Sequence, residues 1–323
     1  MRSSKNLELK PLFLERIKKL LTDEKDLKNY LDILKQKPLN SIRCNTLKIS
    51  PEKLKQRLEK SGWKISQPWN SNPEVMIVQN NLMPGELGRS FEHLLGYYYI
   101  QELASMLPII ALTPKKDEIF LDLCASPGSK TTQAAAKMQN TGTIIANDVS
   151  LGRIMILASN LEKCGVVNSI ITHEEGKRFC EKIAEKDFKF DKILVDAPCS
   201  GEGTLRSTPA TYLMWNINTI KQLSGLQKRL FLKSFELLKP KGEIIYSTCT
   251  HAPEENEEII DYALKALKDR IEILDFELPI KTRKGIIKWQ DKIYDKRVEK
   301  AKRVYPHDNN TEGFFIAKFR RIK

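Results

Sequence analysis

The stretch DLCASPGSKTTQ, residues 122–133, joins an apolar run that begins at Ile119 to a segment of helical composition. A strand, a tight turn of small residues and a helix are the opening unit of a doubly wound α/β fold, whose first turn binds a nucleotide-like ligand. Later strands are short and apolar on both faces, and amphipathic helices join them, which predicts a parallel sheet covered on both sides. These strands are expected at residues 119–124, 143–148, 169–174, 192–198 and 243–249, with two further strands at 272–276 and 314–319.

The chain before this pattern mixes helix and strand signals. Helices are expected at residues 12–21 and 51–62, and strands at residues 41–49 and 75–79. A turn-rich break, NNLMPGELGRS at residues 80–90, separates this part from the regular α/β pattern. The sequence therefore predicts a small α+β module over residues 1–95 and a larger α/β domain over residues 96–323.

The charge of the chain is strongly basic. Its 323 residues include 54 Lys and Arg against 41 Asp and Glu, a net charge of +13. A polyanion such as nucleic acid is a natural partner for this charge. A solvated Lys-rich surface would give the same excess, so charge alone does not choose between the two.

The sequence shows no membrane or secretion signal. No apolar run approaches the roughly 18 residues of a membrane-spanning helix. The first residues, MRSSKNLELKPLF, lack a hydrophobic signal core. We therefore expect a cytoplasmic protein with no membrane partner.

The six cysteines form no C-x-x-C pair, which argues against a zinc site, and a cytoplasmic location argues against disulfides. They are Cys44, Cys124, Cys164, Cys180, Cys199 and Cys249. The four histidines are too scattered to form a metal site, so no metal is expected. They are His93, His173, His251 and His307.

A turn in this position can bind a nucleoside triphosphate, a dinucleotide or S-adenosylmethionine, and residues 124–130 argue against the first two. A P-loop requires glycine where this chain has Cys124 and Ser129, and the G-x-G-x-x-G of a dinucleotide site is absent as well. Asp148, about twenty residues after the turn, ends the second strand, where an acid can accept hydrogen bonds from ribose hydroxyls. It could equally cap the following helix. A ribose site without a pyrophosphate site indicates S-adenosylmethionine.

Two cysteines follow neighbouring strands of the predicted sheet. Cys199 lies in DAPCSGEGT after the fourth strand, and Cys249 lies in YSTCT after the fifth. A free cysteine is often a small buried hydrophobe, but two at the ligand-binding edge favour chemistry. A thiolate that adds to carbon 6 of cytosine makes carbon 5 nucleophilic toward a sulfonium methyl group. Asp196 is then placed to contact the N3 and N4 edge of the base, and Cys199 to assist release. The acidic run after Cys249 is expected to be only the start of a helix.

The motifs together resemble those of the RNA 5-methylcytosine methyltransferases of the Nop/Sun type, from residue 41 to the end of the chain. The resemblance implies a Rossmann-like class I methyltransferase domain with a smaller N-terminal α+β module similar to an RNA-recognition fold. The motifs that carry it are SIRCNTLK, GYYYIQELASMLP, DLCASPGSKTTQ, ANDVSLGR, EEGKRF, DAPCSGEGT, YSTCTHAPEENE and YPHDNNTEGFFIAKF.

The family implies roles for the positions that match its motifs. Cys249 resembles the nucleophile and Cys199 the thiol that releases the product, while Lys130 and Asp196 resemble the pair that touches the target base. Arg43 and Asn45 resemble an RNA-binding motif, and His307 a tail position near the site. The implied cofactor-site residues are Cys124, Ala125, Ser126, Pro127, Gly128, Ser129, Lys130, Asp148, Arg153, Glu175 and Asp196.

The chain departs from the family pattern in a few places. CASPGSK stands where CAAPGGK is usual, and both changes keep the residue small. The family's aspartate at the adenine amino group corresponds to Glu175, with Glu174 as the rival alignment. STCT in place of STCS is a chemically mild change.

The resemblance implies methylation of carbon 5 of cytosine in RNA, with tRNA favoured because compact archaeal-type members without appended domains act on it. An rRNA target is the first alternative. An RNA-binding or assembly factor with an inactive scaffold is the second, although the intact DAPC and STC motifs argue against it. The protein is expected to act as a monomer.

Overall fold

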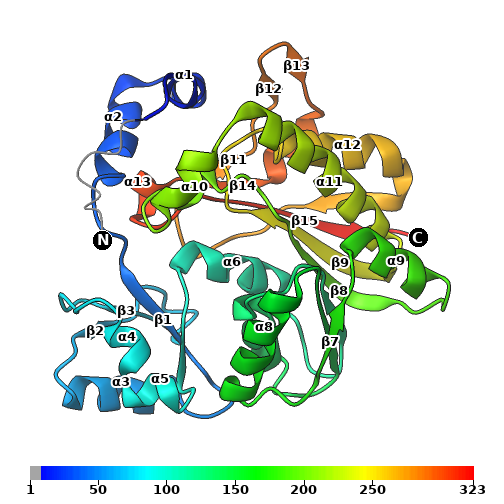
Figure 1. Ribbon diagram of the computed structural model, residues 1–323. Helices are drawn as coiled ribbons and strands as arrows, with labels where there is room; N and C mark the ends of the chain where they lie inside the picture. The colour runs from blue at the N-terminus through cyan, green and yellow to red at the C-terminus, as the bar shows by residue number, and fades with distance from the viewer. Residues whose placement is uncertain (1–8) are drawn as a thin grey trace.

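The computed structural model describes residues 9–323, without the side chains of residues 211, 212 and 214. Residues 1–8 belong to the predicted N-terminal module and to the segment on which the cytoplasmic expectation depends, and they lie outside the described residues. Figure 1 shows a large twisted sheet with helices on both sides, a small sheet beneath it on the left, and two N-terminal helices above that.

The large sheet has nine strands, with the order β11-β14-β15-β9-β8-β5-β6-β7 and β10 also paired to β15. Five adjacent strands, from β9 to the edge strand β7, are parallel, and they confirm the predicted α/β fold: β5 (Ile119–Asp122), β6 (Thr143–Asp148), β7 (Ser169–His173), β8 (Phe190–Asp196) and β9 (Leu238–Thr248). The strand order reverses between β5 and β8, so a crevice for a ligand is expected where these two strands end.

Helices cover both faces of this sheet. Leu121 and Tyr246 belong to the buried cluster with α9, α11 and α12, whereas Phe120 and Ile245 belong to the cluster with α6 and α7. This double burial is the reason why the strands are apolar on both faces. The helices are α6 (Leu103–Leu112), α7 (Ser129–Lys137), α8 (Leu151–Cys164), α9 (Gly176–Ala184), α11 (Ile217–Phe235) and α12 (Glu257–Leu267).

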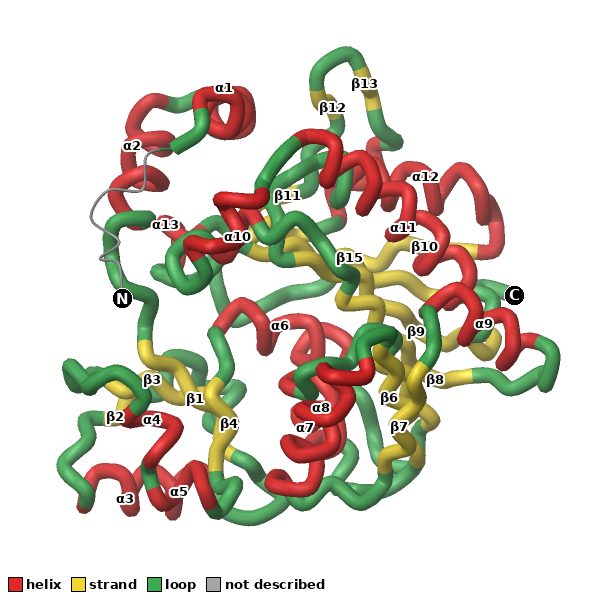
Figure 2. Tube along the Cα trace, viewed as in Figure 1, coloured by secondary structure: helices red, strands yellow, loops and turns green. Residues whose placement is uncertain are grey.

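The C-terminal part of the chain completes one side of the sheet. β10 (Ile271–Leu274) and β15 (Phe314–Arg321) match the two further strands that were predicted, and β15 runs antiparallel to β9. The Lys-rich stretch between them contains short strands, and its β12–β13 hairpin projects from the body (Figure 2). These elements are η3 (Lys268–Arg270), β11 (Arg283–Lys284), β12 (Lys288–Trp289), β13 (Lys292–Ile293), η4 (Lys296–Lys300), β14 (Lys302–Val304) and α13 (Pro306–Asn309).

The N-terminal module contains an antiparallel sheet with the order β2-β3-β1-β4. Its chain order, β-α-β-β-α-β, is that of the split βαβ fold found in RNA-recognition modules. Ile42 and Met76 face α3, whereas Val75 on the opposite face packs into the cluster of α6 and α7. The elements are β1 (Asn40–Cys44), α3 (Pro51–Lys60), β2 (Ile65–Ser66), β3 (Val75–Val78), α4 (Glu86–Arg89), α5 (Phe91–Leu94) and β4 (Tyr98–Ile100).

The predicted boundary at residue 95 does not coincide with the limits of this sheet, because its strand β4 comes after that residue. Two N-terminal helices, α1 (Pro11–Leu20) and α2 (Glu24–Ile33), also pack elsewhere. Phe13 of α1 meets Trp215 edge to face, with ring centroids 5.4 Å apart, in a buried cluster that also contains Tyr30 and Tyr305. The N-terminal helices therefore stabilise the methyltransferase-like part rather than the small sheet.

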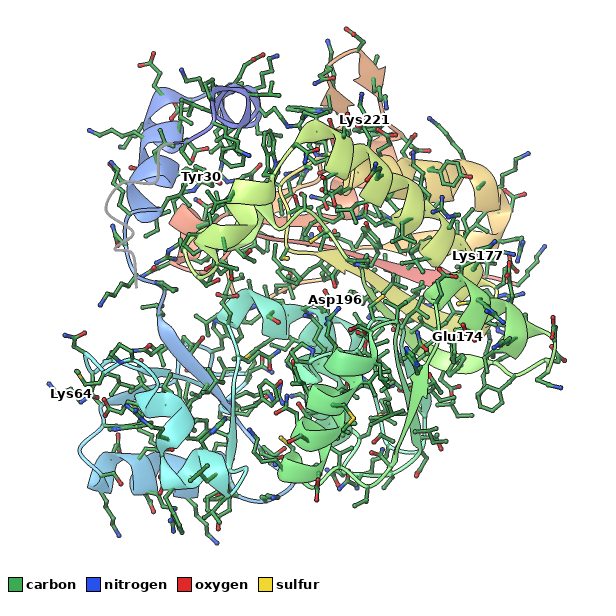
Figure 3. The ribbon with its side chains drawn as sticks, in the orientation of Figure 1. Tyr30, Lys64, Glu174, Lys177, Asp196 and Lys221 are labelled. Carbon is green, nitrogen blue, oxygen red and sulfur yellow. The ribbon has the colours of Figure 1, made fainter. Side chains whose placement is uncertain are left out.

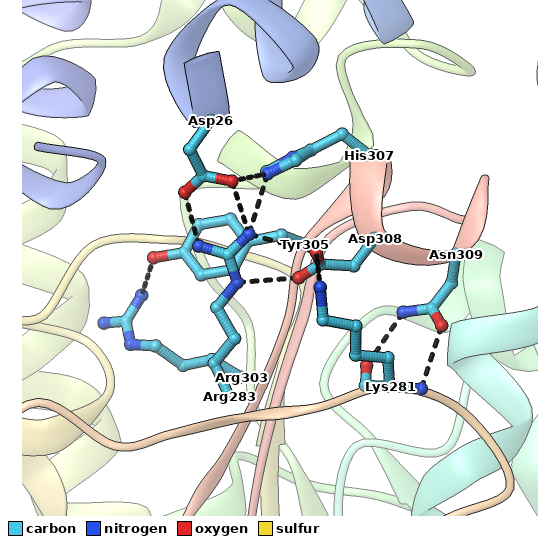
Figure 4. Close-up of polar contacts among 8 residues, drawn as sticks. All are labelled: Asp26, Lys281, Arg283, Arg303, Tyr305, His307, Asp308 and Asn309. Atoms are coloured by element: carbon cyan, nitrogen blue, oxygen red, sulfur yellow. Dashed lines mark hydrogen bonds and ion pairs between the residues drawn. The ribbon is translucent and has the colours of Figure 1, made fainter. Parts of the chain in front are cut away.

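A half-buried polar cluster ties α2 to the C-terminal tail (Figure 4). Arg283 donates to both carboxylate oxygens of Asp26 and, through Nε at 2.7 Å, to Asp308. His307 contacts Asp26 through Nε2 at 2.7 Å. Asp26, His307 and Asp308 have a donor set that a metal could use, but the Arg283 guanidinium already lies between the two carboxylates and neutralises them.

Within the described residues, no helix is both long enough and apolar enough to cross a membrane.

Phe13→Ala should lower the free energy of unfolding by about 3 to 5 kcal/mol, because it removes a fully buried ring from the interface between α1 and Trp215. Leu12→Ala on the same helix is the control, since Leu12 is 47% exposed and its loss should cost about 0.5 kcal/mol or less. Urea denaturation of both variants measures the difference. Equal stability of the two variants would show that α1 does not contribute to the folded core.

Candidate active site

The turn between β5 and α7 forms one wall of a cavity at the point where the strand order reverses. Gly128 caps α7 with a φ of +101°, and a Cβ there would lie 2.9 Å from the Leu157 side chain, so glycine is required. The Thr131 hydroxyl donates to Asp122 Oδ2 at 2.8 Å and holds this carboxyl at the end of β5. Local backbone conformation and one side-chain bond thus fix the turn that the sequence singled out.

Asp148 braces the same turn from the end of β6. Its Oδ2 accepts from the Ser126 N–H at 3.1 Å and its Oδ1 from the Ser150 N–H at 3.0 Å. Arg153 lies 3.6 Å from Asp148 and also donates to the Ser126 carbonyl. Ser150, not Asp148, is the N-cap of α8, so of the two predicted alternatives the capping role is wrong.

The cavity has a volume of about 350 Å³. The Oδ1 atom of Asp122 and the hydroxyl of Ser126, both buried, have no hydrogen-bond partner there. Burial raises the pKa of Asp122 to about 7, although the Thr131 hydroxyl opposes the rise. A polar ligand that carries positive charge would satisfy these atoms, which fits the amino group and sulfonium of S-adenosylmethionine. The lining residues that were predicted are Cys124, Ala125, Ser126, Pro127, Ser129, Lys130 and Asp196.

Part of the lining comes from a segment for which no site role was predicted. Tyr99, Gln101 and Glu102 line the cavity from β4 and the start of α6, as does Ser105. Glu102 Oε2 caps α6 by accepting from the Ala104 N–H at 2.7 Å, and burial raises its pKa. The motif GYYYIQELASMLP was the available signal, because it matches the family in a segment that otherwise reads as core.

The predicted adenine contact lies away from this cavity lining. Glu175 accepts from the N–H groups of Lys177 at 3.2 Å and Arg178 at 3.0 Å, so it caps its own helix. Glu174 forms an ion pair with Lys182, and Figure 3 shows Glu174 near α9, to one side of Asp196. A contact between either carboxylate and adenine stays a prediction.

The two thiols lie together at the ends of β8 and β9. Cys199 Sγ and Cys249 Sγ are 3.3 Å apart, close enough for one thiol to donate to the other sulfur. The hydrogen bond to Cys249 and burial raise the pKa of Cys199 well above its ordinary value, and the Glu255 carboxyl adds to the rise. Cys199 is therefore a neutral thiol at neutral pH in the free protein.

A carboxylate and an amine lie beside the thiols and reach the cavity. Asp196 Oδ2 accepts from Lys130 Nζ at 2.8 Å, and its Oδ1 accepts from the Ser247 hydroxyl at 2.7 Å. Lys130 also donates to Ser105 at 3.1 Å. The geometry brings the four predicted catalytic residues to one edge of the sheet.

Two glycines close the site from the side of the C-terminal tail. The Gly203 N–H donates to the Cys249 carbonyl at 2.9 Å, and the Gly313 N–H donates to the Gly203 carbonyl at 2.9 Å. A Cβ on Gly203 would lie 2.3 Å from the Gly313 carbonyl oxygen. Gly203 belongs to η2 (Glu202–Thr204), which precedes α10 (Pro209–Met214), so the backbone of both cysteine loops depends on this close approach.

The three predicted RNA-binding residues make contacts within the protein. Arg43 is 2% exposed and donates to Gln101, Ser129 and Thr132. Asn45, 3% exposed, donates to two carbonyls, those of Gly96 and Cys164. His307 contacts Asp26 through Nε2. Arg43 and Asn45 thus join the small sheet to the α7 and α8 side, and His307 joins α2 to the tail; a direct contact of these residues with RNA stays a prediction.

Comparison with known proteins identifies the family. Residues 109–320 match the family described as 16S rRNA methyltransferase RsmB/F, and residues 9–103 match the N-terminal domain of 16S rRNA methyltransferase RsmF. The chain belongs to the RsmB/F family. This confirms the resemblance to the Nop/Sun type and the predicted fold class.

Relatives within the family include enzymes named for tRNA and for rRNA. The tRNA (cytosine(49)-C(5))-methyltransferase of Pyrococcus abyssi is 41% identical over 286 residues, 88% of this chain and 89% of that protein. Ribosomal RNA small subunit methyltransferase F of Psychromonas ingrahamii is 37% identical over 316 residues, 96% of this chain but 63% of that protein. The chain thus spans less than two thirds of the bacterial rRNA relative.

A solved structure agrees over the whole chain. A methyltransferase homologue from Pyrococcus horikoshii superposes with a TM-score of 0.83 at 34% identity and covers 99% of both chains. The arrangement of both sheets is therefore shared with a family member of the same length.

Gly203→Ala should destabilise the protein by about 1 to 3 kcal/mol, because its Cβ would force apart the Cys249 turn and the Gly313 backbone. The control is Gly225→Ala within α11, where the new Cβ meets only an arginine side chain at 3.6 Å. This control should be neutral or stabilising by up to about 1 kcal/mol. Denaturant midpoints decide the matter, and a neutral Gly203→Ala variant would contradict the close packing.

Proposed function

We propose that this chain transfers the methyl group of S-adenosyl-L-methionine to carbon 5 of a cytosine in tRNA. The observation that carries the proposal is the pair of thiols 3.3 Å apart after β8 and β9, at the same edge of the sheet as the Lys130–Asp196 pair, which lines a cavity with unsatisfied buried polar atoms. A single nucleophile would serve many group transfers. An adduct at carbon 6 must later be eliminated, which requires a base for the proton on carbon 5, and a second thiol in contact with the first can serve as that base.

The cofactor would be held by the turn after β5. Ser126, Asp122 and Asp148 offer acceptors and a hydroxyl, and the cavity has no glycine-rich phosphate cradle. When bound, S-adenosyl-L-methionine supplies an electrophilic methyl group on a sulfonium sulfur. The carboxylates that line the cavity favour this positive charge over an anionic cofactor.

The chemistry of the base divides between the two cysteines. The Cys249 thiolate adds to carbon 6 of cytosine, while Asp196 contacts the N3 and N4 edge and Lys130 balances its charge. After carbon 5 has accepted the methyl group, the Cys199 thiolate takes the proton from carbon 5. The electrons of that C–H bond form the C5–C6 double bond, and the bond from carbon 6 to Cys249 breaks, which frees Cys249 as a thiolate. Because the pKa of Cys199 is raised in the free protein, its thiol must first lose its own proton to solvent before it can accept the proton from carbon 5.

The target RNA is argued from the relatives that the chain matches. The tRNA (cytosine(49)-C(5))-methyltransferase of Pyrococcus abyssi is 41% identical over 286 residues, whereas the rRNA methyltransferase F of Psychromonas ingrahamii is 37% identical over 316 residues. The higher identity supports the tRNA target. An rRNA target is the second candidate, because both matched family descriptions name 16S rRNA.

The N-terminal module, placed at residues 1–95 by the sequence, is proposed to help bind RNA. One face of its sheet packs against the methyltransferase domain, so the bases cannot stack there as they do on free RNA-recognition sheets. The helix α3 is left as the contact surface, with exposed Lys53 and Lys60. A monomeric, cytoplasmic enzyme is likewise proposed, on the basis of a tRNA substrate.

Cys249→Ala should abolish methyl transfer to RNA, because it removes the sulfur that adds to carbon 6. Cys199→Ala should instead trap protein on RNA as a covalent adduct that survives a denaturing gel. Cys180→Ala is the control, since this thiol is buried in the core away from the site. Methylation by Cys249→Ala, or failure of Cys199→Ala to trap RNA, would contradict the assigned roles.

The RNA target can be read directly. Total tRNA and rRNA incubated with the protein and S-adenosyl-L-methionine should gain bisulfite-resistant cytosines in tRNA alone, and none with Cys249→Ala. Resistant positions confined to 16S rRNA would replace the tRNA proposal with the second candidate.

A further inference from the structure

The acidic run after Cys249 does more than begin a helix. The helix α12 starts at Glu257, but the two residues before it, Glu255 and Asn256, are 0% exposed. A buried carboxyl and a buried amide are costly unless they make hydrogen bonds, so their partners show what they do. Each side chain turns back to one of the two cysteine loops.

Glu255 holds the residues on both sides of Cys199. Its Oε2 accepts from the Ser200 N–H at 3.0 Å, directly after the cysteine. The same oxygen accepts from Gln227 Nε2 of α11 at 2.9 Å, and Gln227 donates to the Pro198 carbonyl at 2.9 Å, directly before the cysteine. Glu255 and Gln227 together thus clamp the Cys199 loop from its two ends.

Asn256 holds the residues on both sides of Cys249. Its Oδ1 accepts from the Thr248 hydroxyl at 2.5 Å, and its Nδ2 donates to the Thr250 carbonyl at 2.9 Å. The two clamps meet where the hydroxyls of Ser200 and Thr250 lie 2.8 Å apart. Neighbouring residues in the chain therefore grip different cysteines.

We propose that Glu255 and Asn256 are positioning residues that serve different steps: Asn256 aims Cys249 for attack on carbon 6, and Glu255, with Gln227, aims Cys199 for release. The proposal rests on the proposed function. The two sulfurs must reach different atoms of one base, carbon 6 for attack and the hydrogen on carbon 5 for release. A displacement of either loop slows its own step, and a misplacement of about 1 Å can cost up to about 100-fold in rate.

The test separates attack from release with methyl-labelled cofactor and tRNA in single-turnover reactions, followed by denaturing gels. Glu255→Ala should still methylate RNA in the first turnover but retain about tenfold or more of it as covalent adduct relative to the unmodified protein. Asn256→Ala should form adduct and methylated product slowly, with no excess of adduct over product. Glu255→Gln should restore release, because its amide oxygen can still accept from the Ser200 N–H.

Two further variants distinguish a displaced loop from a misfolded protein. Gln227→Met, of similar size, removes the bond to Pro198 and should trap adduct as Glu255→Ala does, whereas Thr248→Val removes only the bond to Asn256 and should slow attack. Glu258→Ala is the matched control from the same acidic run, since Glu258 pairs with Lys228 and Lys292 and touches neither loop.

Two sets of results would contradict these proposals. Equal adduct-to-product ratios for the Glu255 and Asn256 variants, or trapping by Glu258→Ala, would reduce both residues to a structural role and overturn the inference. Absence of adduct and of methylated RNA with the unmodified protein would overturn the proposed function itself, and the inference with it.

Discussion

The parallel pairing of β8 with β9 is the constraint on which the site depends. Asp196 and Ser247 lie opposite each other in this pair, so the loops after these strands begin next to one another at the same edge of the sheet. Two thiols far apart in sequence come within 3.3 Å because the strands carry them there, without a disulfide or a metal to draw them together. The later elements, α11, the start of α12 and the tail at Gly313, then fix the loops that the strands have brought side by side.

The candidate site is rich in carboxyl groups, although the net charge of the chain is positive. The chain is basic overall, but the candidate site buries carboxyls, and burial raises the pKa of Asp122 and Glu255 to about 7. Few cations neutralise them: Asp122 bonds to a threonine, and Glu255 to an amide and a backbone N–H. A site of this kind favours a cationic cofactor, while the lysines on the surface favour the phosphates of RNA.

The N-terminal segments act as supports as well as binding elements. One face of the small sheet packs against the helices beside the turn after β5, through Arg43 and Val75. The helices α1 and α2 pack on the segment after the Cys199 loop. The small sheet has the topology of RNA-recognition modules, but in this chain it also supports the large domain by packing against it. This explains why the first five residues of its SIRCNTLK motif are buried.

The sequence by itself determined the parallel sheet, the small-residue turn and both thiols. These depend on local signals: double-sided apolar runs, glycine at a positive φ, and the order of strands, which places successive carboxyl ends at one edge. It could not determine the partners of Arg43, Glu255 or His307, because these partners lie on segments far away along the chain. The partners of Asn256, Thr248 and Thr250, are near in sequence, but the contact depends on how the chain turns after β9. A buried Arg or Glu reads from sequence as a surface charge or a helix start. The tertiary structure buries these side chains and supplies their hydrogen-bond partners. Through these hydrogen bonds the side chains hold the loops of the site in place.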